Sequence, residues 1–591
     1  MNGSKITIIL LIIALCMILA GDLLAFFVQT DFGNIKVKDV RFAGTNGIMM
    51  SGLLYIPKNA TAKTPAPGIL AVHGYINSRE TQDGFAIEFA RRGYVVLALD
   101  ETGHGYSDPP AFANGFGGID GLRYLRTLDF VDGKNIGMEG HSMGGWAILV
   151  AAAVIPDGYK SFVFEGSSTE TLGTPKGSAT FPRNVALVFS QWDEFAGFMW
   201  GAPMAPMIVK TDKLKALFGT TEDVVVGKLY GSISDGTARK LVMPRNTHPW
   251  DHMSTECIGA AVAWFQQTLD GGNKLPPENQ IWIWKEIGNL IALAGMILLF
   301  FPVGALLLKT AFFKELAGTP AEPKPLKGAG WWIGAIIFAI LTGAPFLSYK
   351  EFPVQLKIPA SAFLSQNITT QMLSYALMSG IVAAIFFLIF HFAINRKVNA
   401  TGDNYGLTWS TKLDWIKIAK SFLLALLVAL AGYVTLLISS WLFTVDYRFW
   451  IFAVKPMSNL QFMIFLCYLI FFILAWIGIA TVLHGELRPL IKGKELSMGA
   501  EMLVNMALLV AGFLGFFLFM YVPLFTTGIL GNPYEPLWAI IGIQYLYSMP
   551  ISAFILTYFY RKTGHIYVGV FLVGLFLTWQ IVASQATHFG F

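Results

Sequence analysis

Nine long apolar stretches constrain the fold of this 591-residue chain more than any other feature of its sequence. Each is close to the roughly 20 residues that a helix needs to cross a bilayer, and a backbone surrounded by lipid can satisfy its hydrogen bonds as a helix. The composition agrees, because 54% of the residues are hydrophobic and only 13% are charged. We therefore predict nine membrane-spanning helices, at residues 6–27, 286–308, 329–349, 371–394, 421–443, 458–482, 500–525, 537–559 and 566–586.

The residues between the first and second stretches have the composition of an ordinary soluble protein. We therefore expect three parts: an N-terminal transmembrane anchor at 1–30, a soluble domain at 31–275 and a membrane domain of about eight transmembrane helices at 276–591. The boundary at 270–277 is rich in Gly, Pro and Asn, which is typical of a linker. The first stretch is longer than the apolar core of a usual signal peptide, so we expect an uncleaved anchor.

Lysine and arginine gather on one side of the predicted spans. Because basic loops stay on the cytoplasmic side, we expect a cytoplasmic N-terminus, with the soluble domain and the C-terminus outside the cytoplasm. The cytoplasmic set contains fourteen residues, Lys309, Lys314, Lys324, Lys327, Arg396, Lys397, Lys412, Lys417, Lys420, Arg488, Lys492, Lys494, Arg561 and Lys562, and the opposite set contains four, Lys350, Lys357, Arg448 and Lys455.

The same composition argues against several other classes of protein. The net charge of +5 comes from these loops and does not indicate a nucleic-acid partner. Three scattered cysteines give neither a disulfide framework nor a metal-ligand spacing, so we expect no metal and no cofactor. His391, Glu501 and His565 lie near the ends of predicted spans, so they indicate no ion path through the membrane. The oligomeric state stays open.

Within the soluble region, residues 140–145 read Gly-His-Ser-Met-Gly-Gly. The run 135–138 before them predicts a buried strand, and the run 146–154 after them predicts an apolar helix. A strand, a sharp turn and a helix form the context in which a G-x-S-x-G sequence exposes its serine above the edge of a sheet. The helix N-terminus behind Ser142 also favours developing negative charge. Ser142 is therefore the candidate nucleophile.

Strand-like and helix-like segments alternate through the rest of the soluble region, which predicts a mostly parallel sheet flanked by helices. Sites in such sheets form at the carboxyl ends of the strands. The opening segments 36–42 and 47–56 read as an antiparallel pair. Further strands are expected at 67–72, 94–99, 161–164, 184–189 and 238–243, and helices at 85–92, 119–128 and 255–269.

Four motifs together resemble those of the α/β-hydrolase superfamily. They are the first strands at 47–57, His-Gly-Tyr at 73–75, Asp-Glu-Thr-Gly-His-Gly-Tyr-Ser at 100–107, and Gly-His-Ser-Met-Gly-Gly. The region 36–269 is most similar to the branch of dienelactone-hydrolase-like and S9-like serine esterases, which implies an α/β hydrolase fold. The membrane region resembles no family that we recognise.

The resemblance implies a catalytic triad in the order Ser, acid, His. Ser142 would be the nucleophile. The acid should follow the predicted strand at 184–189. Asp193 stands there, with the neighbouring Glu194 as the alternative. The base should follow the last strand, where the spacing favours His248 and leaves His252 as the alternative.

The backbone N–H groups of Tyr75 and Met143 would form the oxyanion hole of such an enzyme. The other histidines of the region, His73, His104 and His141, are expected to be structural or to line the pocket.

The function predicted from these features is that of a membrane-anchored, extracytoplasmic serine hydrolase. It would cleave a carboxylic ester or thioester, possibly of a lipid, through an acyl-enzyme, so its partners would be an acyl substrate and the bilayer. The alternatives are a transporter or channel with a regulatory hydrolase-like domain, and a serine peptidase. We expect the membrane region to position the soluble domain and to take no part in the chemistry.

Cysteine-accessibility labelling of intact cells tests the orientation. With an impermeant reagent, a cysteine introduced at residue 60 should be labelled and one at residue 400 should be protected, because the basic loops are predicted to be cytoplasmic. The reverse pattern would overturn the predicted orientation.

Overall fold

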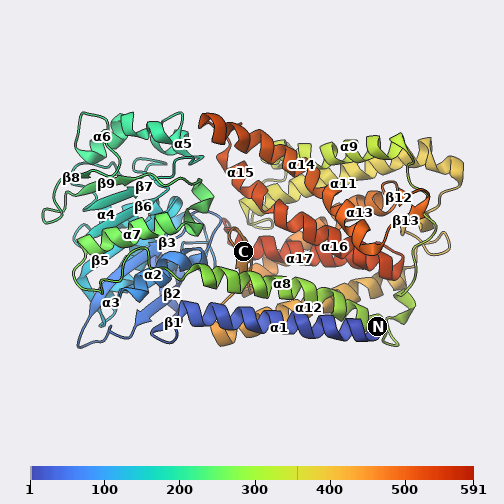
Figure 1. The fold of residues 1–591 in the computed structure, drawn as a ribbon, viewed down its shortest axis with the longest axis horizontal. Helices are drawn as coiled ribbons and strands as arrows, with labels where there is room; N and C mark the ends of the chain where they lie inside the picture. Colours follow the sequence, from blue (N-terminus) through green and yellow to red (C-terminus); the bar gives the residue numbers. More distant parts are fainter. Residues whose placement is uncertain (1–2, 356, 591) are drawn as a thin grey trace.

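The computed structural model describes residues 3–355 and 357–590 and consists of two parts that lie end to end (Figure 1). The sheet part is a β-sheet with helices on both faces, and the bundle is a set of long helices that run roughly along the long axis of the molecule. Helix α1 (Gly3–Gln29) runs along the bundle and leads into the sheet part, and helix α8 (Ile283–Leu307) returns from it. The chain therefore enters the sheet part from one helix of the bundle and leaves it into another.

Within the described ranges, nine strands form one sheet in the order β1-β2-β4-β3-β5-β6-β7-β9-β8. The central pairs from β4 to β9 are parallel, and β1, β2 and β8 pair antiparallel at the two edges. The predicted opening pair and the mostly parallel sheet are thus confirmed. The strands are β1 (Ile35–Ala43), β2 (Met49–Pro57), β3 (Ala66–Val72), β4 (Val95–Asp100), β5 (Val131–His141), β6 (Ser161–Glu165), β7 (Val185–Val188), β8 (Leu229–Tyr230) and β9 (Arg239–Val242).

Helices cover both faces of this sheet, and the side chains of the central strands alternate between them. In β3, Leu70 and Val72 pack in the core under α3 and α4, whereas Ile69 and Ala71 pack in the core under α2 and α7. Strands buried on both faces are expected to be apolar throughout, and every residue of β3 and β4 is buried. The helices are α2 (Asp83–Arg91), α3 (Gly118–Thr127), α4 (Met143–Val154), α5 (Ala196–Trp200), α6 (Asp212–Phe218) and α7 (Thr255–Thr268).

Among the described residues, nine helical segments are long and apolar enough to cross a membrane, as predicted. The predicted span at 537–559 is interrupted, because α15 ends and α16 begins on either side of Gln544. The most enclosed of the nine is α17. Besides α1 and α8, the bundle contains α9 (Ala329–Gly343), α10 (Glu351–Gln355), α11 (Asn367–Ala393), α12 (Trp415–Phe443), α13 (Asn459–His484), α14 (Met498–Thr527), α15 (Pro536–Ile543), α16 (Tyr545–Thr563) and α17 (Tyr567–Ser584), with short hairpins of β10 (Tyr447–Phe449) and β11 (Phe452–Val454) and of β12 (Leu490–Ile491) and β13 (Lys494–Glu495).

Small residues bring α1 and α8 into close contact. A Cβ atom on Gly21 would lie 2.4 Å from the backbone oxygen of Gly288, and one on Gly295 would lie 2.9 Å from the backbone oxygen of Ala14. Glycine at these positions lets the two backbones approach closely, which is a common way for helices to pack in membranes. Helix α1 is therefore an integral element of the bundle.

A buried ion network joins the two parts. Glu80, on the 3-10 helix after β3, lies 2.5 Å from Lys455 and 3.5 Å from Arg448, which both belong to the connection between α12 and α13. On its own side Glu80 lies 3.3 Å from Arg79. Burial alone would raise the pKa of the Glu80 carboxyl, but the three cations hold that pKa well below its usual value. Glu80 therefore stays ionised and binds the sheet part to the bundle.

Candidate active site

Ser142 lies on a sharp turn between β5 and α4. Its backbone has a φ of 53° and a ψ of −118°, a conformation that costs energy for a residue with a side chain. The neighbouring glycines make the turn possible, because a Cβ on Gly140 would lie 2.4 Å from a backbone atom of Gly144, and a Cβ on Gly144 would lie 2.1 Å from the backbone oxygen of Val72. The strand and the helix therefore pass as closely as the motif predicts.

The end of β3 passes beside this turn. A Cβ on Gly74 would lie 2.9 Å from the Cβ of Ser142, so only glycine fits there without displacement. Ring nitrogen Nε2 of His73 accepts the Glu101 N–H at 3.1 Å, and Nδ1 lies 2.7 Å from the backbone oxygen of Gly74. Burial lowers the pKa of His73 to about 4. His73 is therefore a neutral, structural side chain, and it holds the segment that presents Tyr75.

The structure brings Asp193 and His248 together. Asp193 follows β7 and His248 follows β9, two neighbouring parallel strands, so both residues emerge at the same edge of the sheet. Nδ1 of His248 lies 2.9 Å from Oδ2 of Asp193, and the Phe195 N–H donates to Oδ1 of Asp193 at 2.8 Å. Burial lowers the pKa of His248, so its imidazole is neutral near pH 7. A neutral imidazole held at Nδ1 can accept a proton at Nε2.

Glu194 and His252, the alternatives that the sequence left open, take other places. Oxygen Oε2 of Glu194 accepts the backbone N–H of His248 at 2.8 Å, and burial together with the charge of Asp193 raises the pKa of Glu194 to about 7. The His252 ring lies 4.0 Å from the ring of His141, and within the described chain neither of its nitrogens has a hydrogen-bond partner. Of the four possible acid–base pairs, Asp193 and His248 are the pair joined by a hydrogen bond between a carboxylate and an imidazole in the described chain.

Three residues, the candidate base His248 and two neighbours, could offer ligands to a metal. Ligand atoms of His141, His248 and Asp251 lie within 4.8 Å of one another, the one such group found among the described residues. Asp251 accepts the Ser190 hydroxyl with Oδ1 at 2.5 Å, and His141 Nε2 lies 3.1 Å from the backbone oxygen of His248. Oδ2 of Asp251 and Nδ1 of His141 have no hydrogen-bond partner among the described residues. The contact of His141 with the backbone of His248 supports the turn at 248.

One cavity of about 470 Å³ contains Ser142 and His248 in its wall. The wall is mostly apolar, and the described residues that line it include no Asp, Glu, Lys or Arg. Its sheet-part residues are Gly74, Tyr75, Ile76, Asn77, Phe112, Phe116, His141, Ser142, Met143, Trp146, Leu172, Phe195, Phe198, Met199, His248, Pro249 and His252. Both predicted oxyanion donors, Tyr75 and Met143, are thus at the cavity.

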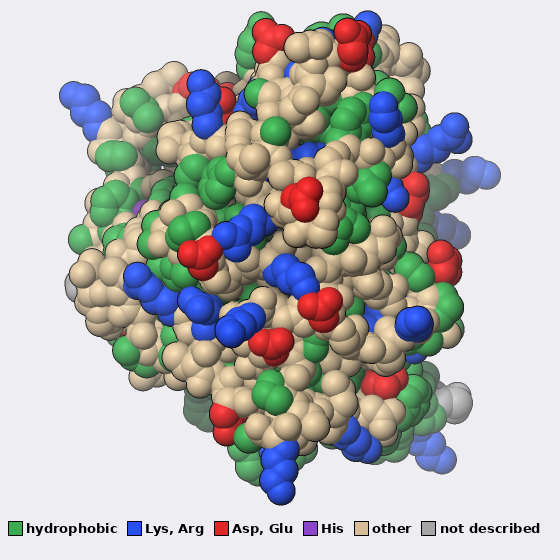
Figure 2. All heavy atoms as spheres, turned by 90° about the vertical axis from the view of Figure 1, so that its left-hand side faces the viewer, with side chains coloured by type: hydrophobic (Ala, Val, Ile, Leu, Met, Phe, Trp, Pro, Cys, Tyr) green, Lys and Arg blue, Asp and Glu red, His purple; other side chains and the backbone are tan. Residues whose placement is uncertain are grey.

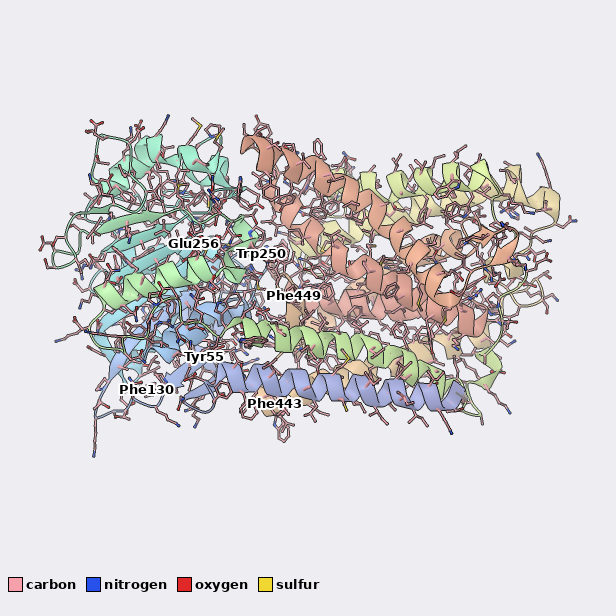
Figure 3. The ribbon with its side chains drawn as sticks, in the orientation of Figure 1. Tyr55, Phe130, Trp250, Glu256, Phe443 and Phe449 are labelled. Carbon is pink, nitrogen blue, oxygen red and sulfur yellow. The ribbon has the colours of Figure 1, made fainter. Side chains whose placement is uncertain are left out.

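The bundle completes this wall, which the sequence did not predict. Ile451 comes from the connection between α12 and α13, Leu537 and Ile540 come from α15, and Gln544 stands at the break before α16. Figure 3 shows the junction, with Trp250 labelled at the end of the sheet part and Phe449 at the near end of the bundle. No local sequence signal marks these residues, because their role depends on contacts between segments about three hundred residues apart.

A segment after α17 also reaches the site. The backbone of Thr587 forms hydrogen bonds with Gly103 and Ala111, and the Tyr75 hydroxyl lies 3.1 Å from Nε2 of His588. His588 also packs against Phe112, which lines the cavity. The position of Tyr75 therefore depends on residues from both parts.

A family model described as alpha/beta hydrolase fold matches residues 67–200. No family model recognises the bundle. A serine hydrolase-like protein of Dictyostelium discoideum is 29% identical over 111 residues, which are 19% of this chain and 30% of that protein. Dipeptidyl peptidase 8 of Mus musculus is 31% identical over 127 residues, which are 19% of this chain and 14% of the peptidase. The chain thus spans less than a third of the length of these curated relatives.

Among solved structures, a dienelactone hydrolase from Anabaena variabilis is 17% identical with a TM-score of 0.28, and covers 40% of this chain and 99% of its own. An S-formylglutathione hydrolase from Agrobacterium tumefaciens is 14% identical with a TM-score of 0.29, and covers 40% of this chain and 96% of its own. Each alignment leaves more than half of this chain unmatched.

Substitutions of His248 and His252 should have very different effects on the rate at which Ser142 is labelled. We expect His248→Ala to slow covalent labelling of Ser142 by a fluorophosphonate by about 10²–10⁴-fold, the usual contribution of a general base. His252→Ala should slow it by less than about tenfold, because His252 contacts neither carboxylate. Mass spectrometry of the labelled peptide over time gives the rates. A larger effect at His252 would reverse the assignment.

Proposed function

We propose that this chain, whose residues 67–200 belong to the α/β-hydrolase superfamily, is a membrane-anchored serine hydrolase that cleaves a carboxylic ester or thioester. The observation that carries the proposal is a shared cavity. Ser142 on its strained turn and His248, hydrogen-bonded to Asp193, both belong to its wall. This arrangement has the parts that nucleophilic acyl transfer requires.

In the proposed reaction, Oγ of Ser142 attacks the acyl carbon while Nε2 of His248 takes the hydroxyl proton. Asp193 orients the imidazole at Nδ1 and stabilises the imidazolium. The N–H groups of Tyr75 and Met143 would receive the oxyanion, and a donor of this kind contributes about 2.7–4 kcal/mol. The alcohol or thiol leaves with the proton of His248, so that Ser142 is acylated. Water then attacks the acyl-enzyme with His248 as base, and the carboxylic acid is released.

The wall of the cavity supports an apolar acyl group as the substrate. The side chains around Ser142 include Phe112, Trp146 and Phe198, and the bundle adds further aliphatic groups. The similarity to dipeptidyl peptidase 8 favours a serine peptidase as the second candidate. A peptide with a charged terminus would bring that charge into a wall with no Asp, Glu, Lys or Arg among its described residues, which is costly. We therefore favour the ester or thioester.

We further propose that the bundle spans a bilayer with the sheet part outside the cytoplasm. Nine apolar helices among the described residues and the basic loops support this orientation. The face of the sheet part turned away from the bundle carries charges of both signs, as a solvent-facing surface does (Figure 2). Ala60 and Ala400 are buried, so cysteines at the exposed Lys63 and Lys397 are the better positions for the accessibility experiment.

Activity-based labelling of the full-length protein tests the proposed nucleophile. A fluorophosphonate should label the wild type on the peptide that contains Ser142, and Ser142→Ala should lose that label completely because no other hydroxyl occupies the strained turn. Ser167→Ala is the matched control, since its hydroxyl donates to the backbone oxygen of Ser142 without lying in the cavity wall. Equal labelling of Ser142→Ala and wild type would refute the assignment.

Filling the cavity from the bundle side should shorten the acyl chains that are accepted. Ile540→Trp should lower the ratio of activity on p-nitrophenyl dodecanoate to activity on p-nitrophenyl acetate by about tenfold or more, because methylenes that no longer fit lose their binding energy. Leu518→Trp, on a side chain of α14 that is 56% exposed, should leave the ratio unchanged. A ratio that Ile540→Trp does not change would place the acyl group elsewhere.

A further inference from the structure

The turn that carries His248 is held by a hydrogen-bond chain that begins in the bundle. His248 is the first residue of a short 3-10 helix (His248–Met253), so its backbone N–H finds no partner inside that helix. Glu194 accepts this N–H with Oε2 at 2.8 Å. The other oxygen, Oε1, accepts the hydroxyl of Tyr521 at 3.0 Å, and Tyr521 belongs to α14. A membrane helix thus reaches the candidate base through a single carboxylate.

The bundle contacts the same turn at a second point. Nε1 of Trp450 donates to the backbone oxygen of Pro249 at 2.6 Å. The Trp250 and Trp450 rings meet edge to face with their centroids 4.4 Å apart. Trp450 lies between β10 and β11, next to the buried ion network. The His248 N–H, through Glu194, and the carbonyl of the next residue, Pro249, are therefore both linked to groups of the bundle.

Glu194 depends on the Tyr521 hydroxyl for its orientation. Glu194 is 5% exposed and stands next to Asp193, so without a donor one of its oxygens would be buried, unpaired and close to a second carboxyl group. The Tyr521 hydroxyl supplies that donor to Oε1, the oxygen that His248 does not use. Tyr521 itself does not line the cavity, so it cannot act by touching the acyl group.

We infer that Tyr521 is a positioning residue for the base, acting through Glu194 on the backbone of His248. The inference rests on the function proposed above. It means that the bundle takes part in aligning the catalytic groups, and that separation of the two parts would misalign His248 even where the sheet stays folded. Displacement of a catalytic group by about 1 Å can cost on the order of 10² in rate.

Steady-state kinetics of the full-length protein on p-nitrophenyl acetate test the inference. Tyr521→Phe removes only the hydroxyl and should lower kcat by about tenfold or more while KM changes by less than about twofold. Tyr534→Phe, at a side chain that is 90% exposed, is the matched control and should change neither value. The thermal midpoint of each variant shows that it is folded.

A second pair of variants separates positioning from simple packing. Glu194→Ala should lose at least as much kcat as Tyr521→Phe. Glu194→Gln should recover most of that loss, because its amide oxygen can accept the His248 N–H and its NH₂ can donate to the Tyr521 hydroxyl. Wild-type kcat in folded Tyr521→Phe would overturn the inference and leave the proposed function standing, provided that the wild type is labelled at Ser142. Absence of that label in the wild type would overturn the proposed function itself.

Discussion

The rest of the structure depends on the buried ion pairs of Glu80. Its carboxylate lies between the two parts and is paired with cations from both. A second buried ion pair, between Asp83 and Lys285, lies one turn further along the same segment and reaches α8. Buried charges of this kind cost about 3–5 kcal/mol when one partner is removed, because the other charge is left without compensation. Because these buried charges must stay paired, they fix the position of the sheet part relative to the bundle. That placement brings the bundle to the carboxyl edge of the sheet.

This placement explains why part of the cavity wall comes from the bundle. In a parallel sheet the reactive groups emerge at the carboxyl ends of the strands, and an open edge there would expose the nucleophile to water on one side. The bundle closes that side with Leu537 and Ile540 of α15. Exclusion of water would strengthen the electrostatic interaction between His248 and Asp193. The apolar helices thus contribute to the site by shape, and through Tyr521 by a hydrogen bond.

Much of the architecture could be predicted because it is encoded in short stretches of sequence. The strands and helices follow from local apolar patterns, and the turn at Ser142 follows from glycines whose added Cβ atoms would collide with backbone. The break at Gln544 could not be predicted in this way, because residues 537–559 are apolar on both sides of it. The choice between Asp193 and Glu194 was likewise open, since the spacings of neighbouring residues to every motif differ by only one position.

The sequence by itself determined the nine apolar helices, the mostly parallel sheet and the turn that presents Ser142, because each depends on the chemistry of neighbouring residues. The tertiary structure alone decided that His248 contacts Asp193, that Glu194 supports the backbone of His248, and that helices α14 and α15 reach the site. These contacts join residues far apart in the chain. They depend on the register of neighbouring strands and on the pairing of buried charges between the sheet part and the bundle. No local sequence pattern specifies either of these.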